Sequence, residues 1–498
     1  MDLKKYEFWF IVGSQDLYGD ETLKQVEANA KVMVSELSKD PVLPYKLVLK
    51  PIAVTPEVIR RLFAEANAAE NCAGIITWMH TFSPSKMWIH GLRMNTKPLL
   101  HLHTQFNRDI PWASIDMDFM NLNQSAHGDR EHGHIFTRMR LPRKVVAGFW
   151  KEPDVRRRIG VWMRAAAARL DGIESKVMRL GDNMREVAVT EGDKVEAQVQ
   201  FGWQVNTWGI GELAARFNAV SDSAAAALAD QYANHYELAA ELKTSGPARN
   251  AMLEQAKIEI ALKEMFTAEG VAAFTTTFQD LHGLPQLPGL AVQRLMEQGY
   301  GFGAEGDWKQ SMLVRSAKLM AAGLPGGVSF MEDYTYHFEP GKEAALGAHM
   351  LEICPTIAAG KPRIEVHPLG IGGKADPARL VFDVAPGKAV LATLIDLGDR
   401  FRMIVNEIET IKIENDMPRL PVARALWRPE PSLEGAAEAW ILSGGTHHSV
   451  YTSALNTEYF RDWAEMMNIE FILIDKDTRT DRLRNELRWG EAYWSNHV

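Results

Sequence analysis

Apolar and polar residues alternate along the first third of the chain in a pattern that predicts strands and helices in turn. Short apolar runs bounded by polar loops are typical of buried strands, and such runs occupy residues 6–12, 46–53, 73–78 and 98–103. Residues 21–37 carry apolar side chains at helical spacing, and Thr55-Pro56 is typical of a helix start. Strands alternating with helices predict a parallel sheet with right-handed crossovers.

The same alternation restarts near residue 176 and then gives way to a different pattern. Runs at 177–180, 186–189 and 272–278 predict further strands, and the Ala-rich residues 223–266 predict long helices. After Gly326-Gly327, short β-like runs dominate, at residues 363–366, 379–384, 388–393 and 401–405. Turns at 385–387 and 397–399 separate them, which is typical of an antiparallel sheet or barrel. Helical segments at 454–467 and 481–489 are expected to cover it.

These patterns divide the chain of 498 residues into three expected domains. A chain of this length is long for a single hydrophobic core. We expect an α/β fold class with two Rossmann-like α/β domains, residues 1–175 and 176–326, followed by a β-rich, barrel-like C-terminal domain, residues 327–498.

Residues 300–350 contain candidate metal-binding side chains that the pattern of apolar and polar positions does not account for. Carboxylates lie there among glycines and apolar residues, where a lone charge is costly to bury. Together with later histidines they form a donor set suited to a divalent ion that leaves room for substrate oxygens. The candidate ligands are Glu305, Glu332, His349 and one of the pair His447-His448. Neighbours on extended backbone face opposite ways, so one histidine of the pair is expected to ligate and the other to meet substrate or a carboxylate.

A glycine motif in the same stretch admits a second interpretation. Residues 301–306 read G-x-G-x-x-G, which in a dinucleotide-binding protein follows a strand and opens a helix. Residues 290–298 before it have helical periodicity instead, and Glu305 within the loop would repel a pyrophosphate. The pattern therefore disfavours a dinucleotide site.

Polar loops follow three of the N-terminal strands, where parallel sheets place their ligands. They are residues 15–18, 79–83 and 104–107, and ordinary loop polarity is the alternative explanation of each. His127, beside a glycine in the polar segment 116–128, is an equally open case, because a capped helix start explains it as well as substrate contact does.

Composition excludes several classes of protein. The net charge of −9 disfavours a nucleic-acid binder, and no apolar run approaches the length of a membrane span. Two cysteines, Cys72 and Cys354, are too few for a disulfide framework, and residues 1–6 lack a signal-peptide core. We therefore expect a cytoplasmic protein.

Long motifs resemble the L-arabinose isomerase family, and the similarity extends over essentially the whole chain. They are residues 13–19, 80–88, 116–128, 303–309, 329–336, 347–350 and 444–448. The family usually has Ala where Thr446 stands, a small departure. The resemblance implies a fold like that of L-fucose isomerase, a homohexamer with sites shared between subunits, and a sugar as the small-molecule partner.

The resemblance also implies residue roles and a reaction. The metal, usually Mn²⁺ and alternatively another divalent ion such as Co²⁺, would be held by Glu305, Glu332, His349 and His448. The sugar would contact Gln15, Leu17, Tyr18, Phe82, His127, Met184, Phe278 and His447. Members convert L-arabinose to L-ribulose and D-galactose to D-tagatose.

Aldose–ketose exchange moves a hydrogen between C2 and C1 and a proton between O1 and O2. Glu305 and Glu332 would act as the acid–base pair across a cis-enediol, and a hydride shift is the competing mechanism. Rival functions are a sugar-binding receptor, which normally lacks such a ligand set, and a metal-dependent aldolase or hydrolase.

Overall fold

The computed structural model describes residues 3–495, which divide into two compact units. One contains the chain up to Leu170 together with Arg461–Asn468, and the other contains Asp171–Phe460 together with the chain from Ile469 onward.

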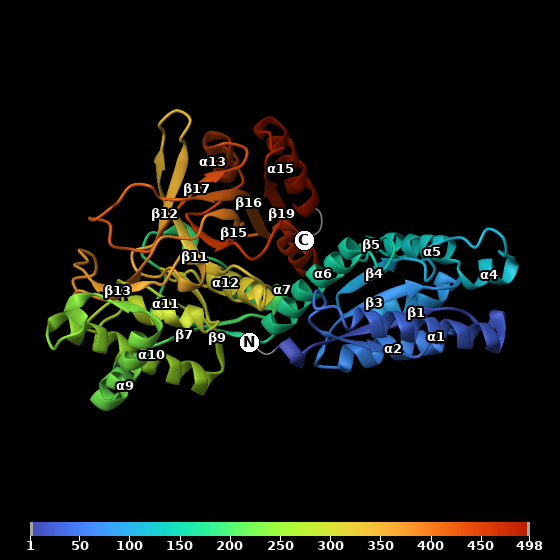
Figure 1. The fold of residues 1–498 in the computed structure, drawn as a ribbon, viewed down its shortest axis with the longest axis horizontal. Coiled ribbons are helices and arrows are strands. Elements are labelled where there is room, and N and C mark those ends of the chain that lie inside the picture. Colours follow the sequence, from blue (N-terminus) through green and yellow to red (C-terminus); the bar gives the residue numbers. More distant parts are fainter. Residues whose placement is uncertain (1–2, 496–498) are drawn as a thin grey trace. The chain divides into compact units, whose positions relative to one another are not determined.

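The first unit is a parallel five-stranded sheet flanked by helices (Figure 1). Its strands run in the order β2-β1-β3-β4-β5. Their bounds are β1 (Glu7–Gly13), β2 (Lys46–Leu49), β3 (Cys72–Met79), β4 (Leu99–His103) and β5 (Lys144–Ala147). All positions of β3 are buried, as expected for a central strand covered on both faces.

The helices of this unit begin with recognisable capping groups. The Thr55 hydroxyl accepts a hydrogen bond from the backbone N–H of Val58, with Pro56 in the first turn of α2. The helices are α1 (Gly19–Leu37), α2 (Pro56–Ala68), α3 (Ile89–Met94), α4 (Met117–Leu122), α5 (Ser125–Arg138) and α6 (Pro153–Gly172). Single 3₁₀ turns are η1 (Leu3–Lys5), η2 (Asp16–Tyr18) and η3 (Ser85–Trp88).

The second unit begins with a parallel sheet in the order β10-β9-β6-β7. Its strands are β6 (Lys176–Leu180), β7 (Gln204–Trp208), β9 (Val271–Thr276) and β10 (Gly301–Ala304). The helices are α7 (Lys194–Phe201), α8 (Ile210–Ala219), α9 (Asp222–His235), α10 (Pro247–Glu269), α11 (Gly289–Glu297) and α12 (Trp308–Ala321). The strand predicted at 186–189 is wrong: Glu186 has a φ of 67°, which ends extended backbone, and a 3₁₀ turn, η4 (Ala188–Thr190), follows.

A closed antiparallel barrel of six strands completes this unit. Around the ring the order is β15-β18-β11-β12-β17-β16, with β16 pairing back to β15 and β19 added in parallel outside β16. The strands are β11 (Val328–His337), β12 (Ala344–Ala348), β15 (Gly387–Asp396), β16 (Phe401–Ile411), β17 (Arg424–Pro429), β18 (His448–Thr452) and β19 (Glu470–Ile474). The accompanying helices are α13 (Leu433–Leu442) and α15 (Thr480–Ser495), whereas most of α14 (Thr457–Met467) belongs to the first unit.

Two of the β runs predicted for the barrel form a separate small sheet instead. Its strands are β8 (Glu237–Leu238), β13 (Arg363–Val366) and β14 (Ala378–Val381), and it adjoins 3₁₀ turns η5 (Ala240–Leu242) and η6 (Pro355–Ile357). The reason is pairing: β13 lies between β14 and β8, which comes from the region before the barrel. The expected fold class is nevertheless confirmed, with parallel α/β sheets first and a barrel after them.

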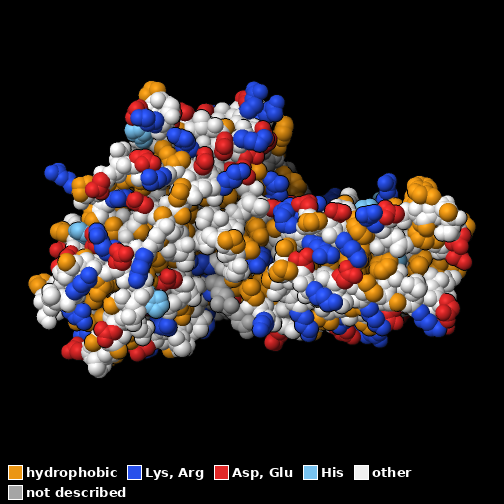
Figure 2. All heavy atoms as spheres, viewed as in Figure 1, with side chains coloured by type: hydrophobic (Ala, Val, Ile, Leu, Met, Phe, Trp, Pro, Cys, Tyr) orange, Lys and Arg blue, Asp and Glu red, His pale blue; other side chains and the backbone are white. Residues whose placement is uncertain are grey.

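The distribution of charged side chains on the surface agrees with the mixed acidic and basic composition of the chain. Acidic and basic side chains are interspersed over the face shown in Figure 2. Across residues 3–495, every helix is too short or too polar to cross a membrane.

Candidate metal and sugar site

Glu305 stands at the turn that leaves strand β10. Its φ of 59° lies in the left-handed region, which non-glycine residues rarely adopt and which is often found at functional sites. Gly306 follows with a φ of 87°, and a Cβ atom there would lie 2.5 Å from the Cα atom of Asn183. The backbone carbonyl of Glu305 accepts a hydrogen bond from the N–H of Met184 at 2.9 Å. The turn is therefore held tightly against the loop after β6.

Barrel pairing brings the other three candidate ligands together. In strand β11, Glu332 is paired with Ala348 of β12 on one side and with His448 of β18 on the other. His349 follows Ala348 directly. A carboxylate and two imidazoles from distant parts of the sequence thus meet on three adjacent strands and the residue that follows one of them.

Each of the two histidines is oriented by a carboxylate through its Nδ1 atom. Nδ1 of His349 donates to Oε2 of Glu352 at 2.5 Å, and Nδ1 of His448 donates to Oδ2 of Asp307 at 3.1 Å. This arrangement occupies Nδ1 and leaves Nε2 as the nitrogen available to a metal ion, as in many metal sites.

The free Nε2 atoms face the glutamates. Nε2 of His349 lies 3.6 Å from Oε2 of Glu332, and Nε2 of His448 lies 3.8 Å from Oε2 of Glu305. His448 is fully buried, and within residues 3–495 its Nε2 has no hydrogen-bond partner. Phe330 packs against both rings, with centroid distances of 5.2 and 5.0 Å.

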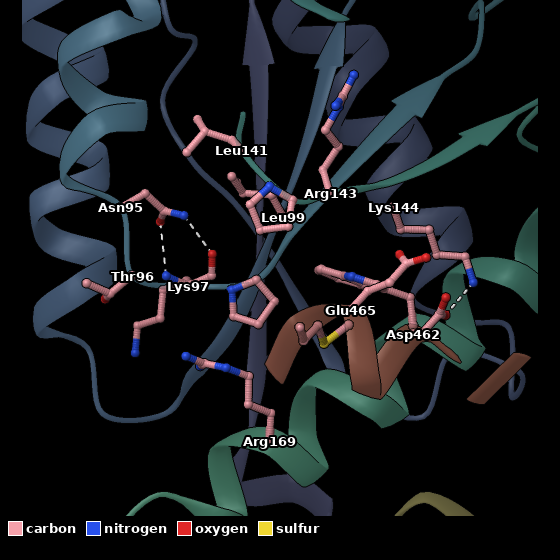
Figure 3. Close-up of a pocket in the computed structure, with 14 residues that line it drawn as sticks. Asn95, Thr96, Lys97, Leu99, Leu141, Arg143, Lys144, Arg169, Asp462 and Glu465 are labelled. Carbon is pink, nitrogen blue, oxygen red and sulfur yellow. Dashed lines mark hydrogen bonds and ion pairs between the residues drawn. The ribbon is translucent and has the colours of Figure 1, made fainter. Parts of the chain in front are cut away.

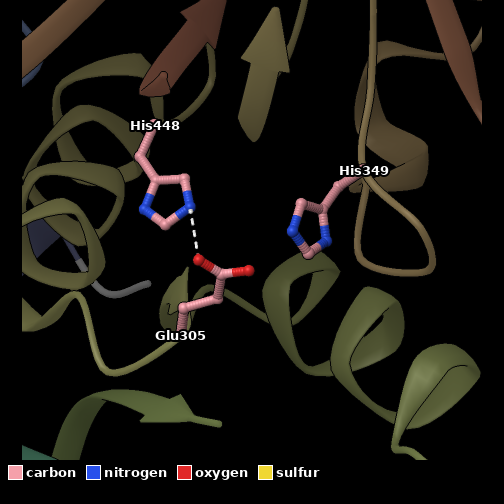
Figure 4. A group of neighbouring side chains, drawn as sticks. All are labelled: Glu305, His349 and His448. Carbon is pink, nitrogen blue, oxygen red and sulfur yellow. Dashed lines mark ion pairs between the residues drawn. The ribbon is translucent and has the colours of Figure 1, made fainter. Parts of the chain in front are cut away.

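Glu305, His349 and His448 form a group that fits a divalent ion (Figure 4). One ligand atom from each lies within 4.8 Å of the others. An orphaned, buried imidazole nitrogen beside a carboxylate is a costly arrangement without a cation, and nitrogen and oxygen donors suit borderline divalent metals. Glu332 lies next to this group through its contact with His349.

The two glutamates differ in acidity. Burial raises the pKa of Glu305, but the neighbouring histidines, His447 first, outweigh it, so the net pKa is lowered. Burial also raises the pKa of Glu332, and the charges of Glu305 and Asp333 add to it, so that pKa stays above its usual value. One carboxylate therefore favours its ionised form while the other more readily holds a proton.

The two histidines also differ in pKa. Burial acts to lower the pKa of His349, but the carboxylate of Glu352 and then that of Glu332 overcome it and raise the pKa to about 9. For His448, burial outweighs the hydrogen bond that its Nδ1 donates to Asp307, and the pKa is lowered.

A cavity of about 170 Å³ opens onto this group. Glu305, Glu332 and His349 line it, and so do Met184 and Phe278, two of the residues expected to contact sugar. The structure therefore brings these predicted site residues together around one space.

His447 borders a second cavity as well as the metal group. It lines a separate cavity of about 250 Å³ within the barrel, together with Asp333 and Trp440. Its Nε2 lies 4.0 Å from Oε2 of Glu305, so it borders the metal group from the barrel side.

The remaining predicted residues lie in the first unit. Gln15, Leu17 and Tyr18 follow β1, whereas Phe82 follows β3 and His127 lies in α5. The rings of Phe82 and His127 pack with centroids 4.7 Å apart. The Tyr18 hydroxyl donates to Gln124 at 2.8 Å, and the Leu17 side chain is 82% exposed.

Sequence reasoning missed the two carboxylates that orient the histidines. Asp307 lies two residues after Glu305, and Glu352 lies three residues after His349. The feature of the sequence that could have revealed these two carboxylates is that each lies within three residues of a candidate ligand, Glu305 or His349.

Comparison with known proteins places the whole chain in one family. Family models described as the N-terminal, central and C-terminal domains of L-arabinose isomerase match residues 2–174, 176–323 and 327–470. The L-arabinose isomerases of Thermotoga petrophila, Thermotoga maritima and Geobacillus kaustophilus are each 60% identical over 494 residues, 99% of both chains.

Among solved structures, the glucose-galactose binding protein GanP of Geobacillus stearothermophilus aligns with 64% of this chain and 92% of its own. The identity is 13% and the TM-score 0.15, too low to carry an argument. Matches to three successive domain models and to full-length relatives, by contrast, show that the chain belongs to the L-arabinose isomerase family of enzymes.

Proposed function

We propose that the chain converts L-arabinose to L-ribulose, and D-galactose to D-tagatose, with a divalent ion as cofactor. The observation that carries the proposal is a pair of glutamates with oppositely displaced pKa values beside two histidines whose Nε2 atoms are free. Mn²⁺ is the expected ion and Co²⁺ an alternative. Its expected ligands are Glu305, Glu332, His349 and His448.

When bound, a divalent ion polarises the sugar carbonyl and stabilises negative charge that develops on adjacent oxygens. The protein supplies the proton transfers. A group that exchanges protons near neutral pH makes the best acid–base catalyst, and the raised pKa of Glu332 moves it in that direction. We propose that one glutamate carries the proton from C2 to C1 and the other carries the hydroxyl proton, with a cis-enediol between the two steps.

The cavity contributes a shape that suits the sugar and surroundings from which water is excluded. Met184 and Phe278 offer apolar walls to the faces of a sugar, and the cavity of about 170 Å³ suits a single monosaccharide. Exclusion of water strengthens the electrostatic effect of each carboxylate on the reacting atoms.

We also propose a cytoplasmic homohexamer in which neighbouring subunits complete each site. Gln15, Tyr18, Phe82 and His127 would then approach the sugar from the first unit of a neighbouring chain. The exposed Leu17 supports a contact surface there. Mixing an inactive Gln15→Ala, Tyr18→Ala protein with inactive Glu305→Gln protein should restore some activity, and no recovery in verified mixed oligomers would contradict shared sites.

The proposed reaction is tested by measuring ketose formed from L-arabinose by wild-type protein stripped of metal and then supplied with Mn²⁺. We expect turnover to depend on the ion, and the Glu305→Gln protein to be nearly inactive with the ion bound. Sugar binding without ketose would favour a receptor, and cleavage products would favour an aldolase or hydrolase. Either result would overturn the proposal.

A further inference from the structure

The first unit contains a cavity of about 180 Å³ whose lining includes none of the residues expected to bind the metal or the sugar. Its walls come from the segments that enter β4 and β5, from α6 and from Arg461–Asn468 (Figure 3). The loops with Gln15 and Phe82 follow the carboxyl ends of strands in the same parallel sheet. The cavity therefore lies at the opposite edge of that sheet.

Cationic side chains predominate around this cavity. They are Lys97, Arg143, Lys144 and Arg169, against the carboxylates of Asp462 and Glu465. Lys144 and Asp462 form an ion pair with each other. The Arg143 guanidinium is turned toward α5, where Nη2 donates to the carbonyl oxygen of Gly133 at 3.2 Å and to the hydroxyl of Thr137 at 2.9 Å.

Lys97 and Arg169 remain without a counter-charge. Within residues 3–495, Arg169 makes no hydrogen bond or ion pair, and Lys97 donates only to the carbonyl oxygen of Ala69, at 3.1 Å. Figure 3 shows their charged ends directed to the same end of the cavity. Burial and then the charge of Arg169 lower the pKa of Lys97, and burial raises the pKa of nearby Cys72 to about 11, so this thiol stays neutral.

Two like charges held in a partly buried space destabilise the protein unless an anion lies between them. We propose that this cavity binds a small tetrahedral oxyanion, inorganic phosphate or the phosphate group of a small metabolite, between the Lys97 ammonium and the Arg169 guanidinium.

The planar guanidinium donates two parallel hydrogen bonds to such an oxyanion, while lysine adds a point charge. Trp162, Pro98 and Met466 give the cavity apolar walls. Its volume lies below that of pockets for drug-sized ligands, which favours a small anion over a nucleotide. A protein with a net charge of −9 attracts anions poorly overall, so binding would require these local cations.

Isothermal titration of the metal-loaded, full-length protein with inorganic phosphate, at constant ionic strength, tests the proposal. We expect one phosphate per chain, with affinity at least roughly tenfold lower in Arg169→Met and Lys97→Met, since each removes a charge-assisted contact. Arg157→Met is the matched control, because Arg157 is an exposed residue on the same helix, paired with Asp154. A parallel titration with glycerol phosphate shows whether a phosphate ester binds as well.

Saturable binding of either probe that depends on Arg169 and Lys97 supports the site. Lack of saturable binding to wild-type protein would overturn it. So would wild-type affinity in both cavity variants, or an equal loss in the Arg157→Met control. Circular dichroism verifies that each variant is folded, and Lys97→Met decides the matter if Arg169→Met does not fold.

Discussion

Replacing Glu352 by glutamine tests how the protein prepares His349 for a metal ion. The carboxylate is 8% exposed and accepts the Nδ1–H of His349 at 2.5 Å. Glutamine keeps the size of the side chain but removes its charge, and its amide N–H favours the tautomer in which Nε2 carries the proton and cannot ligate. Loss of such an orienting partner typically weakens metal binding about 10- to 100-fold, about 1.4–2.7 kcal/mol.

The measurement is the Kd of Mn²⁺ by isothermal titration, for wild type and Glu352→Gln. Glu339→Gln is a matched control, because Glu339 is 51% exposed and pairs with Lys342 on the loop between β11 and β12. An unchanged Kd in Glu352→Gln would refute the reasoning, since the hydrogen bond would then have no part in metal binding. An equal loss in the control would show a nonspecific effect of charge.

Three further predictions follow from the same geometry. His448→Ala should lose bound Mn²⁺ and His447→Ala should keep it, as metal content after dialysis would show. Of these two neighbours, only His448 has its Nδ1 hydrogen-bonded to a carboxylate and, within residues 3–495, an Nε2 without a hydrogen-bond partner. Glu332→Gln should lower kcat at least roughly a hundredfold with the ion still bound, and near-normal turnover would exclude its acid–base role. Gly347→Ala should lower the free energy of unfolding by about 1–3 kcal/mol in thermal unfolding, because its Cβ would lie 2.1 Å from the Trp427 ring. Gly360→Ala is the control, because the space around its Cβ is open. Equal losses of stability in the two variants would contradict the packing argument.

Much of the fold was predictable because hydrophobic periodicity reports directly on burial. The strand that leads to Glu305 was missed because β10 is short and rich in glycine. Its glycines are required by packing: a Cβ at Gly301 would lie 2.0 Å from the carbonyl oxygen of Ser311, and one at Gly303 would lie 2.3 Å from that of Asp307. Helix α12 lies so close to β10 that the side chains typical of strands do not fit at these two glycine positions. The segment therefore lacks the residue types from which a strand is predicted.

The site was predictable in composition but not in arrangement. Acids and histidines among apolar residues pointed to a metal, yet their proximity depends on β11 lying between β12 and β18, a register that no local pattern reveals. Motif resemblance supplied the roles of Met184 and Phe278, and the cavity then placed both beside Glu305. The place of His447, between the barrel cavity and Glu305, likewise follows from tertiary packing.

Anomalous diffraction from crystals grown with Mn²⁺ would locate the metal ion directly. We expect one ion per chain, bound by Glu305, Glu332 and the Nε2 atoms of His349 and His448, with Glu352 and Asp307 still hydrogen-bonded to the opposite ring nitrogens. An ion bound elsewhere, or held by His447 in place of His448, would contradict this expectation.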